Sequence, residues 1–101
     1  SGGNQQKVVL AKWLEIIPKV LVLNGPTVGV DIGAKYDLHN YLHKLAATLK
    51  TAIIVISDDI PELIENCNRI LVMKKGRIVG EYSNMEVDEH TLLAYVTGQE
   101  N

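Results

Sequence analysis

The chain has little of several features that define other classes of protein. It contains a single cysteine, Cys67, among 101 residues, so an internal disulfide is impossible and a reducing compartment is expected. No apolar run approaches the roughly 20 residues that a membrane-spanning helix needs. The formal net charge is only −2, which gives no electrostatic reason to expect nucleic acid as a partner. Composition therefore favours an ordinary globular protein.

The N-terminus also lacks an initiator methionine and a signal peptide, and this abrupt start suggests a fragment of a longer protein. The chain opens on Ser1-Gly2-Gly3-Asn4, and helical spacing of apolar residues predicts a helix over 5–17. Glycines before a helix N-terminus can direct several backbone N–H groups at one anion. Judged on these four residues alone, a glycine-rich cap without a ligand is the favoured interpretation.

The stretch 19–31 predicts a strand, a polar turn and the start of a helix. Residues 20–23 form an uninterrupted apolar run, typical of a parallel strand buried on both faces. Asn24, Gly25 and Pro26 follow at the carboxyl end of this strand, where open α/β sheets place their ligands. Asp31 can accept hydrogen bonds from the first turn of the next helix. We therefore expect a site-bearing strand–loop–helix unit here.

The next helix is expected over 33–49. His39 and His43 on it are four residues apart, which is the spacing of helical metal-ligand pairs. No third ligand lies close by in the sequence, so metal binding is not expected. The apolar stripe predicted to face the core comprises Leu38, Tyr41, Leu42, Leu45, Ala46 and Leu49.

The second half of the chain predicts shorter elements. Asp59, with Glu62 three residues later, predicts a capped helix that ends near Asn66. A Gly76 turn predicts a β-hairpin, and Gly98 predicts the end of a last helix. The ranges are 52–56 for a strand, 69–73 and 77–82 for the hairpin, and 88–97 for the helix. The order αβαβαββα predicts a layered α/β fold, mainly parallel, with a C-terminal antiparallel hairpin.

Several segments then match one family. The sequence S-G-G-N-Q-Q-K at 1–7 resembles the signature motif of ATP-binding cassette (ABC) ATPases, in the variant typical of carbohydrate importers. The segment 21–27 resembles the Walker B segment, 28–31 the D-loop, and 56–58 the switch (H-loop). The hairpin at 69–82 also follows the family pattern. Four motifs in the right order, over essentially the whole chain, reverse the interpretation of the N-terminus as a cap without a ligand.

The resemblance implies a partial P-loop NTPase (ABC ATPase) fold. Residues 1–101 would be the C-terminal part of a nucleotide-binding domain, from the signature motif to the domain end. The nearest resemblance is to the second of two fused ATPase domains in ribose- or galactose-type importers. No G-x-x-x-x-G-K-[ST] motif occurs in the sequence, so the phosphate-cradling Walker A element is absent from it.

The resemblance also implies a mechanism and partners. Two such domains sandwich ATP and Mg²⁺, and each signature motif serves the site of the other domain. Transmembrane permease subunits would be direct partners, and a periplasmic or extracellular sugar-binding protein an indirect one. The implied location is the cytoplasmic face of a bacterial cell membrane, with no cofactor expected for this chain alone. The nucleotide-binding residues carried over are Ser1, Gly2, Gly3, Asn4, Gln5 and Asp31.

Three positions depart from the family pattern. Asn24 replaces the Walker B aspartate that serves Mg²⁺, and a neutral amide attracts a hard cation less than a carboxylate does. Gly25 replaces the catalytic glutamate and has no side chain to activate water. Asp58 stands at the switch histidine position, where its charge would repel a γ-phosphate. We therefore predict that this domain's own site is catalytically silent and holds no metal.

Two functional hypotheses follow from different classes. In the first, the chain is part of the ATP-binding subunit of a sugar importer and supplies the signature motif to its partner's site. In the second, it belongs to a non-hydrolytic regulatory domain in which nucleotide only clamps two domains together. A third, an unrelated α/β domain with chance matches, is disfavoured by the four ordered motifs. The missing upstream segment distinguishes the first two: an intact phosphate-loop lysine there favours nucleotide binding, and a second complete cassette favours transport.

Overall fold

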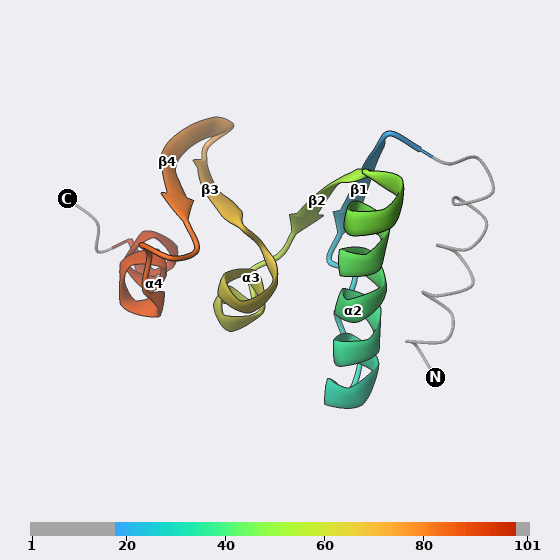
Figure 1. Cartoon of the computed structure of the whole chain (residues 1–101). Helices are drawn as coiled ribbons and strands as arrows, with labels where there is room; N and C mark the ends of the chain where they lie inside the picture. The colour runs from blue at the N-terminus through green and yellow to red at the C-terminus, as the bar shows by residue number, and fades with distance from the viewer. Residues whose placement is uncertain (1–17, 99–101) are drawn as a thin grey trace. The chain divides into compact units, whose positions relative to one another are not determined.

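The computed structural model describes residues 18–98 of the chain. Its elements are β1 (Val20–Asn24), α2 (Ile32–Leu49), β2 (Ala52–Ile56), α3 (Ile60–Asn66), β3 (Arg69–Lys74), β4 (Arg77–Ser83) and α4 (Glu89–Thr97) (Figure 1). The helix predicted over 5–17 lies outside the described residues. The backbone divides between Ile56 and Ser57 into two compact units, which are described separately below.

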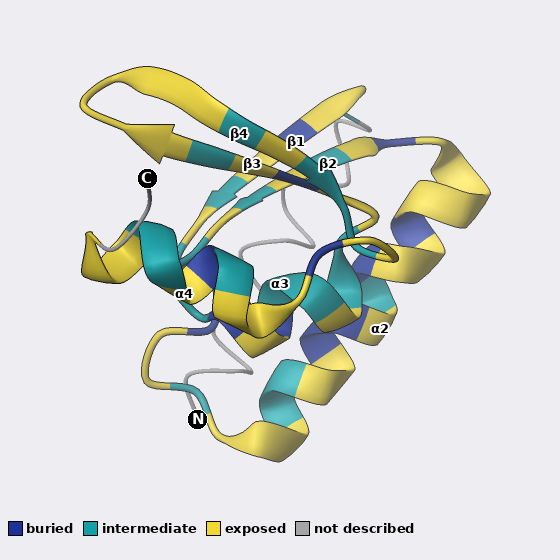
Figure 2. Cartoon of the chain, turned by 90° about the vertical axis from the view of Figure 1, so that its left-hand side faces the viewer, coloured by how far each residue is buried: buried dark blue, intermediate teal, exposed yellow. Residues whose placement is uncertain are grey.

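The first unit is a β–α–β arrangement. Strands β1 and β2 pair in parallel, in a register that runs from Val20 opposite Ala52 to Asn24 opposite Ile56. Helix α2 connects the two strands, and in Figure 2 its buried positions lie along one side of the helix. The unit is therefore built around the packing of one helix on one face of a parallel pair. Its core comprises Leu21, Leu38, Leu42 and Leu45, with Leu23, Tyr41, Ile53 and Val55 packed against them.

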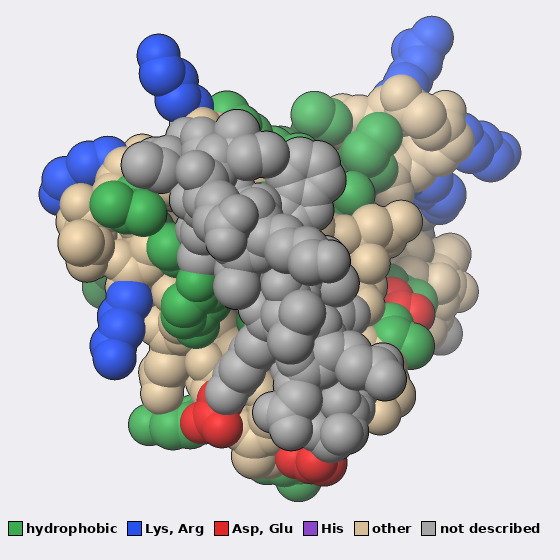
Figure 3. Space-filling view, turned by 90° about the vertical axis from the view of Figure 1, so that its right-hand side faces the viewer, with side chains coloured by type: hydrophobic (Ala, Val, Ile, Leu, Met, Phe, Trp, Pro, Cys, Tyr) green, Lys and Arg blue, Asp and Glu red, His purple; other side chains and the backbone are tan. Residues whose placement is uncertain are grey.

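The prediction that β1 is buried on both faces is wrong. Leu21 is buried, but Val20 and Val22 on the opposite face are 54% and 57% exposed. Ile54 and Ile56 of β2 are each 51% exposed. Side chains alternate between the two faces of a strand, and among residues 18–56 helix α2 packs on the face that carries Leu21. Hydrophobic side chains are accordingly visible at the surface in Figure 3.

Helix α2 begins and ends close to the predicted residues. The predicted stripe is correct at Leu38, Leu42 and Leu45, which are buried, but wrong at Leu49, which is 44% exposed, and at Ala46, which is also exposed. The 18 residues of α2 span about 27 Å at 1.5 Å per residue. The five residues of β2 span only about 16 Å. Helix α2 is therefore longer than the strands on which it packs.

The second unit contains α3, the hairpin of β3 and β4, and α4. The two strands pair antiparallel, with an irregularity in the register between Val72 and Met73. Lys75 and Gly76 in the turn have φ angles of 51° and 78°, as a two-residue primed turn requires. The hydroxyl groups of Tyr82 and Tyr95 share a hydrogen bond of 2.7 Å between β4 and α4. The core of the unit comprises Ile60, Ile70, Val87 and Leu92.

The predicted helix ends in this unit are confirmed. The Glu62 N–H donates to Asp59 Oδ1 at 3.2 Å at the start of α3. The Thr91 N–H donates to Asp88 Oδ1 at 2.7 Å at the start of α4. Gly98, with φ 73°, ends α4. The prediction of an α/β fold with a C-terminal antiparallel hairpin is therefore confirmed. None of the helices between residues 18 and 98 is long and apolar enough to span a membrane.

Candidate functional site

The loop after β1 begins at the exposed carboxyl end of the strand. Asn24 is the last residue of β1 and is exposed. The Gly25 N–H donates to the carbonyl oxygen of Ile56 at 2.8 Å, which extends the hydrogen bonding of the parallel pair by one residue. Gly25 itself has φ 58°, in the left-handed region. The loop is thus attached at its first residue to the end of β2.

The loop is folded by its own backbone. The Val28 N–H donates to the Gly25 carbonyl at 3.3 Å, and the Val30 N–H donates to the Thr27 carbonyl at 3.2 Å. Thr27 is only 5% exposed, whereas the side chain of Val28 is 79% exposed. Gly29, with φ 73°, is the third residue of the second turn. These turns carry the chain from Gly25 to the start of α2.

Asp31 ends the loop and caps α2. Its Oδ1 accepts a hydrogen bond of 2.8 Å from the Ala34 N–H, and its carbonyl accepts one of 2.9 Å from the Lys35 N–H. This confirms the predicted N-cap. The carboxylate therefore has a structural role at an exposed helix end, and its nucleotide-binding role stays a prediction.

The loop after β2 is shorter and belongs to the second unit. Ser57 Oγ accepts a hydrogen bond of 3.0 Å from the Asp59 N–H, and Asp59 then caps α3. Asp58 lies between them and is exposed. Of the predicted site residues, the structure places Asn24, Gly25 and Asp31 on one loop and Asp58 on another. Ser1, Gly2, Gly3, Asn4 and Gln5 lie outside the described residues.

The donor groups at the end of β1 do not fit a Mg²⁺ site. Mg²⁺ binds through carboxylates and waters with strict geometry, and Asn24 offers only a neutral amide. Gly25 offers no side chain, and the Asp31 carboxylate already accepts the hydrogen bond that caps α2. Between residues 18 and 98, no group of three or more His, Cys, Asp or Glu residues is placed to hold a metal ion.

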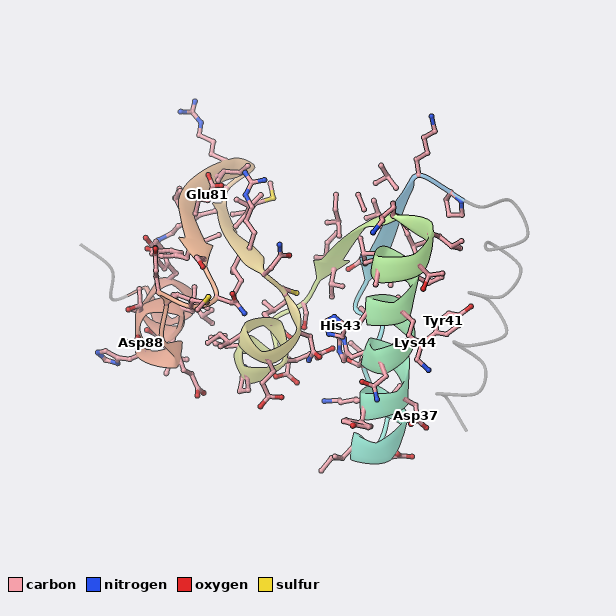
Figure 4. The ribbon with its side chains drawn as sticks, in the orientation of Figure 1. Asp37, Tyr41, His43, Lys44, Glu81 and Asp88 are labelled. Carbon is pink, nitrogen blue, oxygen red and sulfur yellow. The ribbon has the colours of Figure 1, made fainter. Side chains whose placement is uncertain are left out.

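The remaining candidate groups have structural surroundings. His39 is buried on α2, whereas His43 is exposed, so the two do not share one environment. Figure 4 shows His43 projecting from α2 beside Lys44, and Asp88 at the start of α4. Burial, reinforced by the charge of Glu62, raises the pKa of the Cys67 thiol, which keeps it protonated and unreactive.

The conformation of the loop after β1 was not predicted from the sequence, where Gly25 was considered only as a missing side chain and Gly29 was not considered. A signal was present, because glycine at both positions of a short loop permits positive φ angles. The backbone hydrogen bond from Gly25 to Ile56 gave no sequence signal, since it depends on pairing between strands that are distant in the chain.

No family model matches the chain. It is similar to curated proteins over nearly its whole length. It is 48% identical over 99 residues to the ribose import ATP-binding protein RbsA 1 of Streptomyces coelicolor, covering 98% of this chain and 19% of that protein. It is 46% identical over 98 residues to the xylose import ATP-binding protein XylG of Geobacillus kaustophilus, covering 97% of this chain and 19% of that protein. The chain thus spans about a fifth of the length of these relatives.

A solved structure shows the same fold. The structure of cbiO1 from Clostridium perfringens, described as part of the ABC transporter complex cbiONQ, matches with a TM-score of 0.79. The two chains are 28% identical, and the match covers 95% of this chain and 38% of cbiO1.

Proposed function

Because this chain belongs to the ABC transporter ATP-binding proteins of the ribose and xylose import type, we propose that it is the C-terminal part of a nucleotide-binding domain, the second of two fused domains. In this proposal it supplies the signature motif to the ATP site of a partner domain and does not hydrolyse ATP at its own site. The whole protein acts at the cytoplasmic face of the membrane with permease subunits and, indirectly, a sugar-binding protein.

The observation that carries the silent-site part of this proposal is the end of β1. The residue pair that should hold Mg²⁺ and activate water is Asn24 and Gly25, at the exposed carboxyl end of the strand. A neutral amide followed by a residue without a side chain cannot supply a general base. Asp58 in the switch position adds a negative charge where a γ-phosphate would need a donor. Three substitutions with the same consequence support loss of hydrolysis at this site.

The part that this chain contributes lies in residues 1–5. The Ser1 hydroxyl and the backbone N–H groups of Gly2 and Gly3 are donors suited to a phosphate. Glycine lacks a Cβ, so its backbone can approach the phosphate closely. ATP bound by the partner domain would supply the phosphoryl group, and Mg²⁺ bound there would neutralise the negative charge of that group. The residues of this chain then bind and orient that group from the opposite side.

A non-hydrolytic clamp or regulatory domain is the second candidate function. The residues Asn24 and Gly25 support this second function as well as the first, because their side chains remove hydrolysis without removing nucleotide binding. The two candidates differ in the partner domain. A complete, catalytically intact partner cassette in the same protein supports transport, and its absence supports a clamp.

The test is ATP turnover of the full-length transporter reconstituted in membranes. The change Gly2→Leu places a bulky side chain where the backbone approaches the phosphate. Loss of one such preorganised donor costs about 2.7–4 kcal/mol, or roughly 10²–10³ in rate. The matched comparison is the double change Asn24→Asp with Gly25→Glu, which should change turnover much less while Asp58 remains. Normal turnover of the Gly2→Leu variant would contradict the role of the motif in trans.

A further inference from the structure

Asn24 and Gly25 form the only asparagine–glycine pair in the sequence. Asn24 is the last residue of β1 and is exposed, and Gly25 follows it in the loop. Glycine has no Cβ, so its backbone nitrogen is open to approach from the preceding side chain. The pair therefore places a side-chain amide beside an accessible backbone nitrogen at the carboxyl end of the strand.

These two groups can react with each other, with water as the only other reactant. The backbone nitrogen of Gly25, once it loses its proton, attacks Cγ of Asn24 and forms a new C–N bond. The bond from Cγ to the side-chain nitrogen breaks, and this nitrogen leaves as ammonia after it takes up a proton. The product is a cyclic imide, a succinimide. Water then opens the ring at one of its two carbonyl carbons, which gives either aspartate or isoaspartate without any change of oxidation state.

A hydrogen bond in the structure restrains this reaction. The Gly25 N–H donates to the carbonyl oxygen of Ile56 at 2.8 Å, so the nitrogen that must attack is held by the neighbouring strand. It cannot turn towards the side chain of Asn24 until this hydrogen bond opens. The ends of secondary-structure elements open at a lower free energy than their interiors do. The reaction is therefore slowed in the folded protein but not prevented.

Asn40 provides a comparison within the same unit. It is also exposed, but it lies within α2 and is followed by Tyr41. The Cβ and ring of a tyrosine hinder the approach of the backbone nitrogen, and the interior of a helix opens less readily than the end of a strand. Exposure of an asparagine therefore does not by itself predict the reaction, whereas the following glycine and the position at a strand end do.

We propose that Asn24–Gly25 is a self-modification site, at which Asn24 deamidates at a rate set by opening of the hydrogen bond between Gly25 and Ile56. The aspartate product places a carboxylate at the end of β1, where the chain is made with a neutral amide. The isoaspartate product adds a methylene group to the main chain and displaces Gly25 from Ile56. Neither product gives residue 25 a side chain, so the site still lacks a general base. This inference does not depend on the function proposed above.

The experiment incubates the full-length protein in buffer and follows the peptide that contains residue 24 by liquid chromatography and mass spectrometry. We expect the mass increase of an amide-to-acid change, in two products of which one elutes with the same peptide from the Asn24→Asp variant. Deamidation of Asn24 should be about tenfold or more faster than that of Asn40, because the strand end opens more readily. Its rate should rise about tenfold per unit of pH, as the deprotonated fraction of the attacking nitrogen does.

Two controls isolate the cause. Asn24→Gln keeps the amide but lengthens the side chain by one methylene group, which disfavours ring closure, so the mass of its peptide should stay constant. Guanidinium chloride removes the hydrogen bond to Ile56 and should speed deamidation of Asn24 by at least about twofold, the lower limit for the net strength of one hydrogen bond. Both readouts are masses, so their failure leaves the Gly2→Leu test of the proposed function unaffected.

Two results would overturn the proposal. Deamidation in the folded protein that is no faster at Asn24 than at Asn40 would show that the pair is not a modification site. Equal rates at Asn24 in buffer and in guanidinium chloride, at the same pH, would show that the hydrogen bond to Ile56 does not control the reaction.

Discussion

The two units of the chain stabilise their strands in different ways. In the first, one long helix covers one face of a parallel pair, and four leucines form the buried core. In the second, two short helices share a core with an antiparallel hairpin. Within residues 18–56, the strands of the first unit are therefore stabilised by packing against α2, and the loop after β1 begins at their carboxyl ends. The second closes its strands with a two-residue turn and has no comparable loop between them.

The same contrast appears in the left-handed residues of each unit. Lys75 and Gly76 reverse the hairpin at an exposed turn, and nothing lies within 4 Å of a Cβ added at Gly76. Gly25 has a similar φ angle but lies beside Val28 and donates to β2. A positive φ angle therefore marks a simple connection in one unit and a positioned loop in the other.

Leu38→Ala should destabilise the first unit most strongly. Leu38 is 1% exposed and belongs to the buried core that α2 forms with β1 and β2. Truncation of a buried leucine costs about 2–5 kcal/mol. Leu49→Ala, on the same helix but 44% exposed, is the matched control and should cost much less. Denaturant unfolding followed by far-UV circular dichroism measures both. Equal losses would show that the end of α2 is packed as tightly as its centre.

Asp31→Ala should have an intermediate effect. The Asp31 carboxylate accepts the Ala34 N–H at 2.8 Å, and removal of an N-cap typically costs about 1 kcal/mol. Asp58→Ala, at the corresponding exposed loop after β2, should leave stability nearly unchanged because α3 is capped by Asp59 instead. The measurement is the midpoint of thermal unfolding for each variant. A larger loss for Asp58→Ala than for Asp31→Ala would contradict the assignment of the caps.

The smallest expected effect is a pH dependence in the second unit. Hydrogen bonds from Thr91 hold the pKa of Asp88 below its ordinary value of 3.8. A carboxylate with a lowered folded-state pKa stabilises the protein above its unfolded-state pKa, and the contribution is lost as the pH falls through the folded-state pKa. Stability should therefore fall slightly as the pH drops below about 4. Asp88→Asn should weaken this dependence, which unfolding curves between pH 5 and pH 2.5 would show. An identical slope in both proteins would contradict it.

The sequence predicted the local features of the fold well. The caps at Asp31 and Asp59, the turn at Gly76 and the helix end at Gly98 all follow from the chemistry of a few adjacent residues. The burial of β1 was predicted wrongly, because an apolar run does not reveal how many helices cover the sheet. The positive φ angle of Gly25 was not predicted, although a glycine in a short loop permits it, and its hydrogen bond to Ile56, 31 positions away, gave no local signal. The sequence identified the candidate site positions, and the structure showed that one of them, Asp31, caps α2.

We propose that this domain assists hydrolysis in its partner and performs none itself. The most direct measurement is ATP turnover of the full-length transporter after replacement of the catalytic glutamate in the partner domain by glutamine. We predict that turnover falls to the level of a heat-denatured control, because Asn24 and Gly25 leave the remaining site without a general base. Residual turnover at half the original rate would contradict the claim and would show that this domain hydrolyses ATP at its own site.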